Sequence, residues 1–164
     1  MGFPFFRRFS IGLLAGVLGV LALAGTFNRI VDPFWYFRDV SIDGFNAVKT
    51  KFRRFERHVK PAIVAREKPQ AIVLGSSFAE IGLDPRNAAF TDAGRLKGYN
   101  FGIAGAFWDM TRCYLEFALR NSAPQRIVIG IPLGDLPAVD CSERLATMGD
   151  PGMGPLLFSG RALR

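Results

Sequence analysis

The sequence contains only one histidine and two cysteines among its 164 residues. Zinc and related metal sites are built largely from these two residue types at short, regular spacings. Cys113 and Cys141 are far apart along the chain and the histidine, His58, is far from both, so we expect no metal site and no cofactor. The cysteines fit either a disulfide or two buried thiols. The thiols are favoured, because free cysteine is commonly buried as a small apolar side chain.

Charge is absent from residues 9–27, FSIGLLAGVLGVLALAGTF, a run of nineteen residues. A helix needs about 20 apolar residues to cross the hydrocarbon core of a bilayer. The run therefore predicts a transmembrane anchor within residues 1–30. The tripeptide ALA at residues 22–24 has the form of a signal-peptide cleavage site, and this alternative stands beside the favoured interpretation of an uncleaved anchor.

Three glycines of the span, Gly12, Gly16 and Gly19, fall on one helical face. Small residues allow another helix to approach closely within lipid, so this face predicts a transmembrane protein partner. Arg7 and Arg8 precede the span and favour a cytoplasmic amino terminus, because positive residues beside a span are retained inside. The predicted localisation is therefore the bacterial inner membrane, crossed once, with the following domain in the periplasm.

Positive charge is concentrated after the span, where residues 49–68 contain eight basic and two acidic side chains. Apolar residues recur here at spacings of three and four, a period typical of an amphipathic helix, at Phe45, Val48, Phe52, Phe55 and Val59. The basic residues of the opposite face include Lys51, Arg53, Arg54 and Arg57. Two interpretations have equal weight. The helix lies on anionic headgroups or an acidic partner, or it packs on its own domain with its charged face in solvent.

Residues 31–69 are predicted as an interfacial segment followed by this basic helix. Trp35 and Tyr36 are aromatic residues of the kind that lie at a membrane–water interface. Pro61 and Pro69 are expected to bracket the end of this region and to mark the entry to the core domain. The basic cluster would suit nucleic-acid phosphates, but an exported domain tethered to a membrane rarely meets them, so we expect no nucleic-acid partner.

The remainder of the chain, residues 70–164, alternates short apolar runs with helical segments. AIVLG, GYNFGI and RIVIGIPL are typical of buried strands. Helices are expected over residues 77–81 and over WDMTRCYLEFALRN. This order predicts an α/β domain with a parallel sheet, which is incomplete because it has three strands. Ligands bind at the carboxyl ends of such strands, where Ser77, Gly105 and Asp135 fall.

Two blocks, KPQAIVLGSSFAEIGLDP and YNFGIAGA, resemble in order and spacing those of SGNH or GDSL-type hydrolases, and specifically a membrane-anchored bacterial group of that superfamily. The resemblance implies a partial flavodoxin-like, three-layer α/β/α domain. It implies that Ser77 stands at the nucleophile's position and that Gly105 supplies an N–H to the oxyanion. Asn100 and Asp135 are implied as binding positions only.

The chain departs from that family in the groups that would activate the serine. Gly134 stands where the family has a third-block asparagine, and no histidine follows Ser77. His58 precedes the serine, but Arg57 and Lys60 lie beside it and favour a solvated histidine on a basic helix. Serine is a poor nucleophile unless a base takes its proton, so Ser77 is better interpreted as an N-cap or helix-start residue.

These observations predict a single-pass membrane protein whose SGNH-like domain is catalytically incomplete and serves as an accessory or structural subunit of a membrane complex. The alternative is a fragment of an envelope serine esterase or O-acyltransferase that acts on acylated glycans, with Ser77 as nucleophile. A third interpretation, binding of glycans or acyl groups without turnover, uses the same cleft.

Overall fold

The structure is a computed structural model that describes residues 3–49, 52–131, 136–148 and 158. The chain divides into two compact units, with a boundary between Arg53 and Arg54. The anchor unit contains the long first helix and the segment that follows it. The α/β unit, Arg54–Pro151, contains the sheet together with most of the predicted basic helix, so residues 31–69 do not form one unit.

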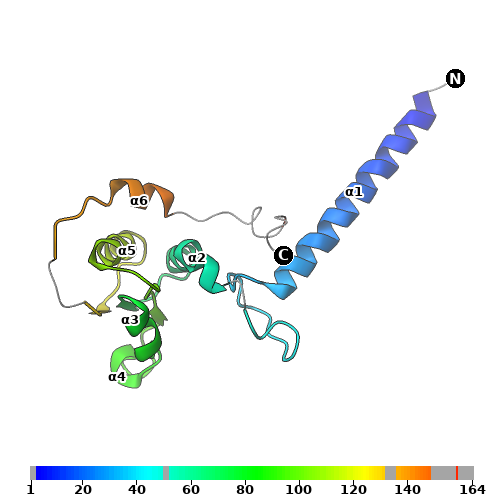
Figure 1. Cartoon of the computed structure of the whole chain (residues 1–164). Coiled ribbons are helices and arrows are strands. Elements are labelled where there is room, and N and C mark those ends of the chain that lie inside the picture. The colour runs from blue at the N-terminus through cyan, green and yellow to red at the C-terminus, as the bar shows by residue number, and fades with distance from the viewer. Residues whose placement is uncertain (1–2, 50–51, 132–135, 149–157, 159–164) are drawn as a thin grey trace. The chain divides into compact units, whose positions relative to one another are not determined.

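Helix α1, Phe3–Val31, is the long blue ribbon of Figure 1. Its part from Phe6 to Val31 is long and apolar enough to cross a membrane, and only 6% of its apolar window is buried. At 1.5 Å per residue, these 26 residues extend about 39 Å, more than the ~30 Å of a hydrocarbon core. A Cβ added at Gly12, Gly16 or Gly19 would meet nothing within 4 Å. The predicted small-residue face is therefore open within the anchor unit.

The segment after α1, residues 32–49, forms turns rather than the start of the predicted amphipathic helix. Gly44 has a φ of +77°, which interrupts helical geometry. The side chain of Asn46 accepts a backbone N–H four residues earlier and donates to a carbonyl in the last turn of α1. Phe45 and Val48 are therefore exposed in turns, and their assignment to the helix was wrong because side-chain hydrogen bonds compete with helix formation.

Helix α2, Phe52–Glu67, continues through Pro61 and ends before Pro69, so the two prolines bracket its end, as predicted. Proline has no N–H for the carbonyl of Arg57, four residues earlier. The hydroxyl of Tyr114 donates to that carbonyl at 3.0 Å, and burial raises the pKa of Tyr114 to about 12, which keeps the hydroxyl protonated. The apolar face of α2 packs inside the α/β unit, with the side chains of Val59, Ile63 and Val64 buried.

Three parallel strands form the sheet in the order β2-β1-β3, with β1 at Ala71–Leu74, β2 at Gly98–Asn100 and β3 at Arg126–Ile129. The predicted strands and their parallel pairing are confirmed, although β2 is shorter than the run GYNFGI. Every residue of β1 is buried, as expected for a strand covered on both faces. No residue of β3 is fully buried, since β3 lies at an edge of this sheet.

Helices cover both faces of the sheet. Figure 1 shows α2 and α5 (Trp108–Asn121) on one side, and α3 (Ser77–Gly82) and α4 (Ala88–Thr91) on the other. The apolar core lies between β1, α2 and α5, and includes Val64, Ile72, Leu74, Phe101, Tyr114 and Phe117. The helices predicted after the first two strands are confirmed as α3 and α5, whereas α4 and α6 (Ser142–Thr147) were not predicted.

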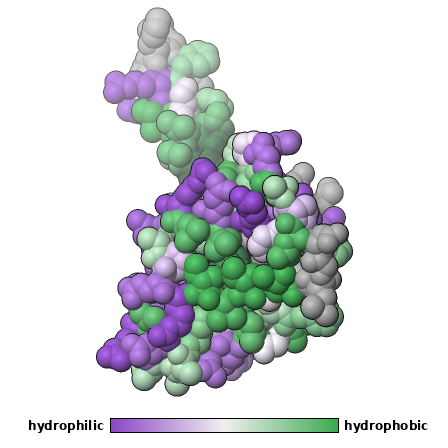
Figure 2. All heavy atoms as spheres, turned by 90° about the vertical axis from the view of Figure 1, so that its left-hand side faces the viewer, coloured by the Kyte–Doolittle hydropathy of each residue, from purple (hydrophilic) through white to green (hydrophobic). Residues whose placement is uncertain are grey.

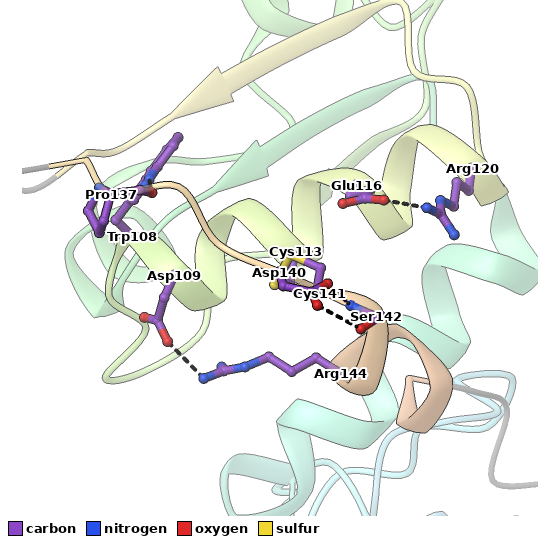
Figure 3. Close-up of a disulfide and its surroundings, with 10 residues drawn as sticks. All are labelled: Trp108, Asp109, Cys113, Glu116, Arg120, Pro137, Asp140, Cys141, Ser142 and Arg144. Atoms are coloured by element: carbon purple, nitrogen blue, oxygen red, sulfur yellow. Dashed lines mark hydrogen bonds and ion pairs between the residues drawn. A yellow bond between two sulfur atoms is a disulfide. The ribbon is translucent and has the colours of Figure 1, made fainter.

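Cys113 of α5 and Cys141 form a disulfide (Figure 3). The favoured prediction of two buried thiols was wrong, because the chain after β3 returns to α5 and brings the two Cα atoms within 5.3 Å. Arg144 on α6 donates to the carboxylate of Asp109 on α5 at 2.7 Å. This ion pair is a second link between α5 and the chain that follows β3. The disulfide and the ion pair together fasten α6 to α5.

Candidate functional site

A cavity of about 500 Å³ opens at the carboxyl ends of the three strands. Residues 76–79 line it after β1, residues 105–107 after β2, and residues 130–131 after β3. The structure therefore brings Ser77 and Gly105 together in one cavity, as expected from the meeting of parallel strand ends. Asp135, the third residue predicted at this edge, lies outside the described residues.

Two glycines shape the walls of this cavity. Gly75, between β1 and α3, has a φ of +139°, and a Cβ there would lie 2.8 Å from the carbonyl oxygen of Gly130. The absence of a side chain at Gly75 thus allows α3 to start close to the end of β3. Gly105 has a φ of +69°, a conformation that glycine adopts at no steric cost. Both positions require glycine for the cavity to have this shape.

Ser76, rather than Ser77, is the N-cap of α3. The Ser76 hydroxyl accepts the N–H of Phe78 at 3.4 Å, and its backbone is extended, as at a typical N-cap. Ser77 is the first residue of the helix, so the helix-start part of the prediction is confirmed and the N-cap part is wrong. Ser77 lines the cavity, and its hydroxyl makes no hydrogen bond with another described residue.

The cavity wall is mainly apolar. Among its residues, Phe78 is 89% exposed and Phe107 is 73% exposed. Figure 2 shows a broad hydrophobic area on one face of the molecule. Among the described residues of the wall, none carries an acid or a base. His58 is exposed on α2, as predicted for a solvated histidine. Within the described part of the wall, Ser77 therefore has no group that could take its proton.

Asn100, at the end of β2, is fully engaged in holding α3. Its Nδ2 lies 3.1 Å from the carbonyl oxygens of Ala79 and Glu80 and 2.9 Å from that of Leu83. Its Oδ1 accepts the N–H of Gly102 at 3.0 Å. These contacts add a donor to three carbonyls at the carboxyl end of a short helix, where backbone partners are few. The Asn100 amide therefore positions α3 and the turn that carries Ser76. Asn100 itself is not among the residues that line the cavity.

A buried cluster of charges lies behind the loop that contains Gly105. The Nζ of Lys60 on α2 is 2.9 Å from Oε1 of Glu80 on α3 and 3.5 Å from Oε2 of Glu56. The same ammonium donates to the carbonyl of Gly102. Glu56 accepts the N–H of Ala104 at 3.0 Å through its other oxygen. The cluster therefore joins α2, α3 and the loop after β2, and it holds the wall of the cavity from behind.

Burial raises the pKa of Glu56 above its usual value of 4.5, and this outweighs Lys60 and the Ala104 N–H, which lower it. The nearby carboxyl group of Glu80 raises the pKa of Glu56 further. Two carboxyl groups that share one ammonium in a buried place are more stable when one of them retains a proton. The direction of the shift at Glu56 favours retention of a proton by this carboxyl group.

The predicted membrane or partner residues occupy different environments. Arg53, Arg54 and Arg57 are exposed on α2, while Lys51 lies outside the described residues. The apolar face of α2 is packed on its own domain, which agrees with one of the two predicted interpretations of this helix. In the anchor unit, Trp35 is 43% exposed and Tyr36 is 4% exposed.

Within the described ranges, no three histidine, cysteine, aspartate or glutamate side chains come together in a way that could hold a metal ion. Comparison of the chain with protein-family models, curated proteins and solved structures found no match.

Proposed function

We propose that this chain is a single-pass protein of the bacterial inner membrane whose α/β unit is a non-catalytic, SGNH-like domain in the periplasm. In this proposal α1 is the anchor and the amino terminus is cytoplasmic. The domain serves as an accessory or structural subunit of a membrane complex. One observation carries the proposal. Ser77 lines an apolar wall, and the described residues of that wall include no acid and no base.

The strand order supports the SGNH-like fold. Flavodoxin-like sheets have the order 2-1-3-4-5, and β2-β1-β3 corresponds to its first three strands. Ligands in such sheets bind where the strand order reverses, between the first and third strands, and the cavity lies at that point. The resemblance of the two sequence blocks and the topology thus support the same proposal independently.

The disulfide supports a periplasmic α/β unit. Disulfides persist in oxidising compartments such as the bacterial periplasm and are rare in the cytosol. Cys113 and Cys141 both belong to the α/β unit, so this unit and the basic amino terminus are expected on opposite sides of the membrane. Alkylation of intact cells before and after reduction tests the point. If both thiols are alkylated without reductant, the periplasmic placement is wrong.

The second candidate function, an envelope serine esterase or O-acyltransferase, is favoured by one observation. Ser77 and Gly105 line the same cavity, as a nucleophile and an oxyanion donor would. An active enzyme would also need a base, which the described part of the wall does not supply. Without a base, the serine hydroxyl is expected to react slowly with acyl compounds.

Labelling with a fluorophosphonate separates the two candidates. The purified full chain in mild detergent is treated with the probe beside the variants Ser77→Ala and Ser76→Ala. We expect the three proteins to be labelled equally and weakly. If labelling is strong, is abolished by Ser77→Ala and survives in Ser76→Ala, the non-catalytic proposal is refuted and the esterase is supported.

The subunit role is tested by purification of tagged chain after extraction in mild detergent. We expect a transmembrane protein to copurify, and we expect Gly16→Leu to release it. The variant should fold normally, because the space beside Gly16 is open. Ala24→Leu, an exposed alanine away from the glycine face, is the matched control and should retain the partner. If the wild-type chain is purified without any copurifying protein, the proposal is contradicted.

A further inference from the structure

The segment of residues 32–49, here called the juxtamembrane loop, buries two polar side chains and exposes four large apolar ones, Trp35 at 43% and three that follow Val40. Asp32 is 3% exposed and Asn46 is 2% exposed. Ile42, Phe45 and Val48 are 47%, 57% and 82% exposed. Aspartate and asparagine are mostly exposed in proteins that are surrounded by water, so this distribution requires an explanation.

The buried polar side chains fix the shape of the loop. The Asp32 carboxylate accepts the N–H groups of Tyr36 at 2.8 Å and Arg38 at 2.9 Å. The Asn46 side chain accepts the N–H of Ile42 at 2.6 Å and donates to the carbonyl of Val40 at 3.2 Å. These side chains satisfy backbone groups inside the loop. The outward direction of the apolar side chains is therefore built into the fold of the loop.

The loop is also fastened to the end of α1. Asn46 donates to the carbonyl of Ile30, and the Nζ of Lys49 donates to that of Val31 at 2.9 Å. The N–H of Asp32 donates to the carbonyl of Asn28 at 2.9 Å. These bonds satisfy carbonyls of the last helical turn, which have no partner within the helix. The three exposed apolar side chains therefore stay next to the end of the apolar span.

The length of the span places this end at the level of the lipid headgroups. The candidate span Phe6–Val31 extends about 39 Å, against ~30 Å for a hydrocarbon core and about 40–45 Å for a whole bilayer, and Arg29 lies near its carboxyl end. We propose that the juxtamembrane loop docks into the bilayer interface, with Ile42, Phe45 and Val48 inserted at the boundary between headgroups and acyl chains. This inference rests on the proposed anchoring by α1.

The charges of the loop specify the kind of lipid surface. Residues 29–49 contain three basic and three acidic side chains, so this region has no net charge. Arg29 is paired with Asp39, and the guanidinium of Arg38 lies 5.3 Å from the centre of the Trp35 ring. Insertion therefore depends on apolar contact and needs no anionic lipid. This distinguishes the loop from the exposed arginines of α2, for which an anionic surface was predicted.

Quenching of tryptophan fluorescence by brominated acyl chains tests the proposal in the full chain, reconstituted in vesicles. The background carries Trp35→Phe and Trp108→Phe, and the reporters are Phe45→Trp and Val48→Trp, in separate proteins. Leu18→Trp, in the middle of α1, reports anchoring. Phe78→Trp, in the α/β unit, is the exposed reference.

We expect emission from the Phe45 and Val48 reporters to fall roughly twofold or more on bromination, equally in zwitterionic and anionic vesicles. If these reporters are no more quenched than the Phe78 reference while the Leu18 reporter is quenched, the inference is overturned and the anchor stands. If the Leu18 reporter is not quenched, the anchor itself fails. Protection of the loop reporters from acrylamide without lipid quenching would mean that a second copy covers the loop, and would also overturn the inference.

Discussion

Replacement of Lys60 by methionine is expected to destabilise the α/β unit strongly. Methionine retains most of the side-chain volume but removes the ammonium that lies 2.9 Å from Glu80, 3.5 Å from Glu56 and within hydrogen-bond reach of the Gly102 carbonyl. Only 4% of the side chain of Lys60 and 4% of that of Glu56 is exposed, so water cannot replace the lost partner. Breaking a buried ion pair by removal of one partner costs about 3–5 kcal/mol, and we expect a loss of this size in the free energy of unfolding.

Glu56→Gln is expected to cost far less, about 1 kcal/mol, although it changes the same cluster. A protonated glutamic acid and a glutamine are both neutral, have nearly the same shape, and can both accept the Ala104 N–H through one oxygen. The raised pKa of Glu56 means that the folded chain retains a proton which the unfolded chain releases above pH 4.5. The wild-type protein therefore loses stability as pH rises from 4.5 through the folded-state pKa. The glutamine variant lacks this loss, so its stability relative to wild type improves over that window.

Urea unfolding of the full chain in mild detergent, followed by circular dichroism at several pH values, measures both effects. Lys97→Met is the matched control, because Lys97 forms an exposed pair with Glu67 and exposed pairs contribute about 0–1 kcal/mol. If Lys60→Met costs no more than Lys97→Met, the buried cluster does not hold the cavity wall. If Glu56→Gln costs as much as Lys60→Met at every pH, Glu56 is ionised in the folded state and the assignment of the proton is wrong.

The same assay checks two further expectations. Cys113→Ser should lower the free energy of unfolding by about 3–4 kcal/mol, because the disulfide with Cys141 closes a loop of 28 residues. Reductant should lower the free energy of unfolding of the wild-type protein by the same amount and leave that of the variant unchanged. If reductant also destabilises the variant, this account is contradicted. Gly98→Ala should cost about 3 kcal/mol or more, since its Cβ would lie 1.8 Å from the carbonyl oxygen of Pro85, whereas Gly82→Ala, with nothing within 4 Å, should be nearly neutral. Equal unfolding midpoints for the two alanine variants would refute the packing argument at β2.

The parallel sheet could be predicted because its signals are local. β1 is an uninterrupted apolar run that ends at Gly75, and β3 is a similar run that ends at Gly130. A helical segment lies between each strand and the next, which requires a crossover and hence parallel pairing. The meeting of Ser77 and Gly105 in one cavity follows from the same rule. The edge of the sheet at which the cavity lies could thus be predicted without any knowledge of side-chain contacts.

The errors arose where contacts between distant residues decide the local structure. The passage of α2 through Pro61 contradicts no prediction, but it too involves a distant contact, since the hydroxyl of Tyr114, more than fifty residues later, donates to the carbonyl of Arg57. The pairing of Cys113 with Cys141 depends on the path of the chain after β3, which periodicity does not describe. The turns around Phe45 depend on one asparagine side chain that binds the end of α1. None of these contacts has a sequence signature at the position that it changes.

Charge in this chain was the least predictable feature, and it bears directly on the candidate site. Lys60 is one of the eight basic residues of segment 49–68, yet it is buried against Glu56 and Glu80 instead of facing solvent. A carboxylate can activate a serine, but Glu56 is not among the residues that line the cavity, and it accepts a backbone N–H. Glu80 is paired with the ammonium. The buried acids of the described α/β unit therefore position the loop that carries Gly105, and their binding to Lys60 and to the backbone makes them poor bases for the Ser77 hydroxyl.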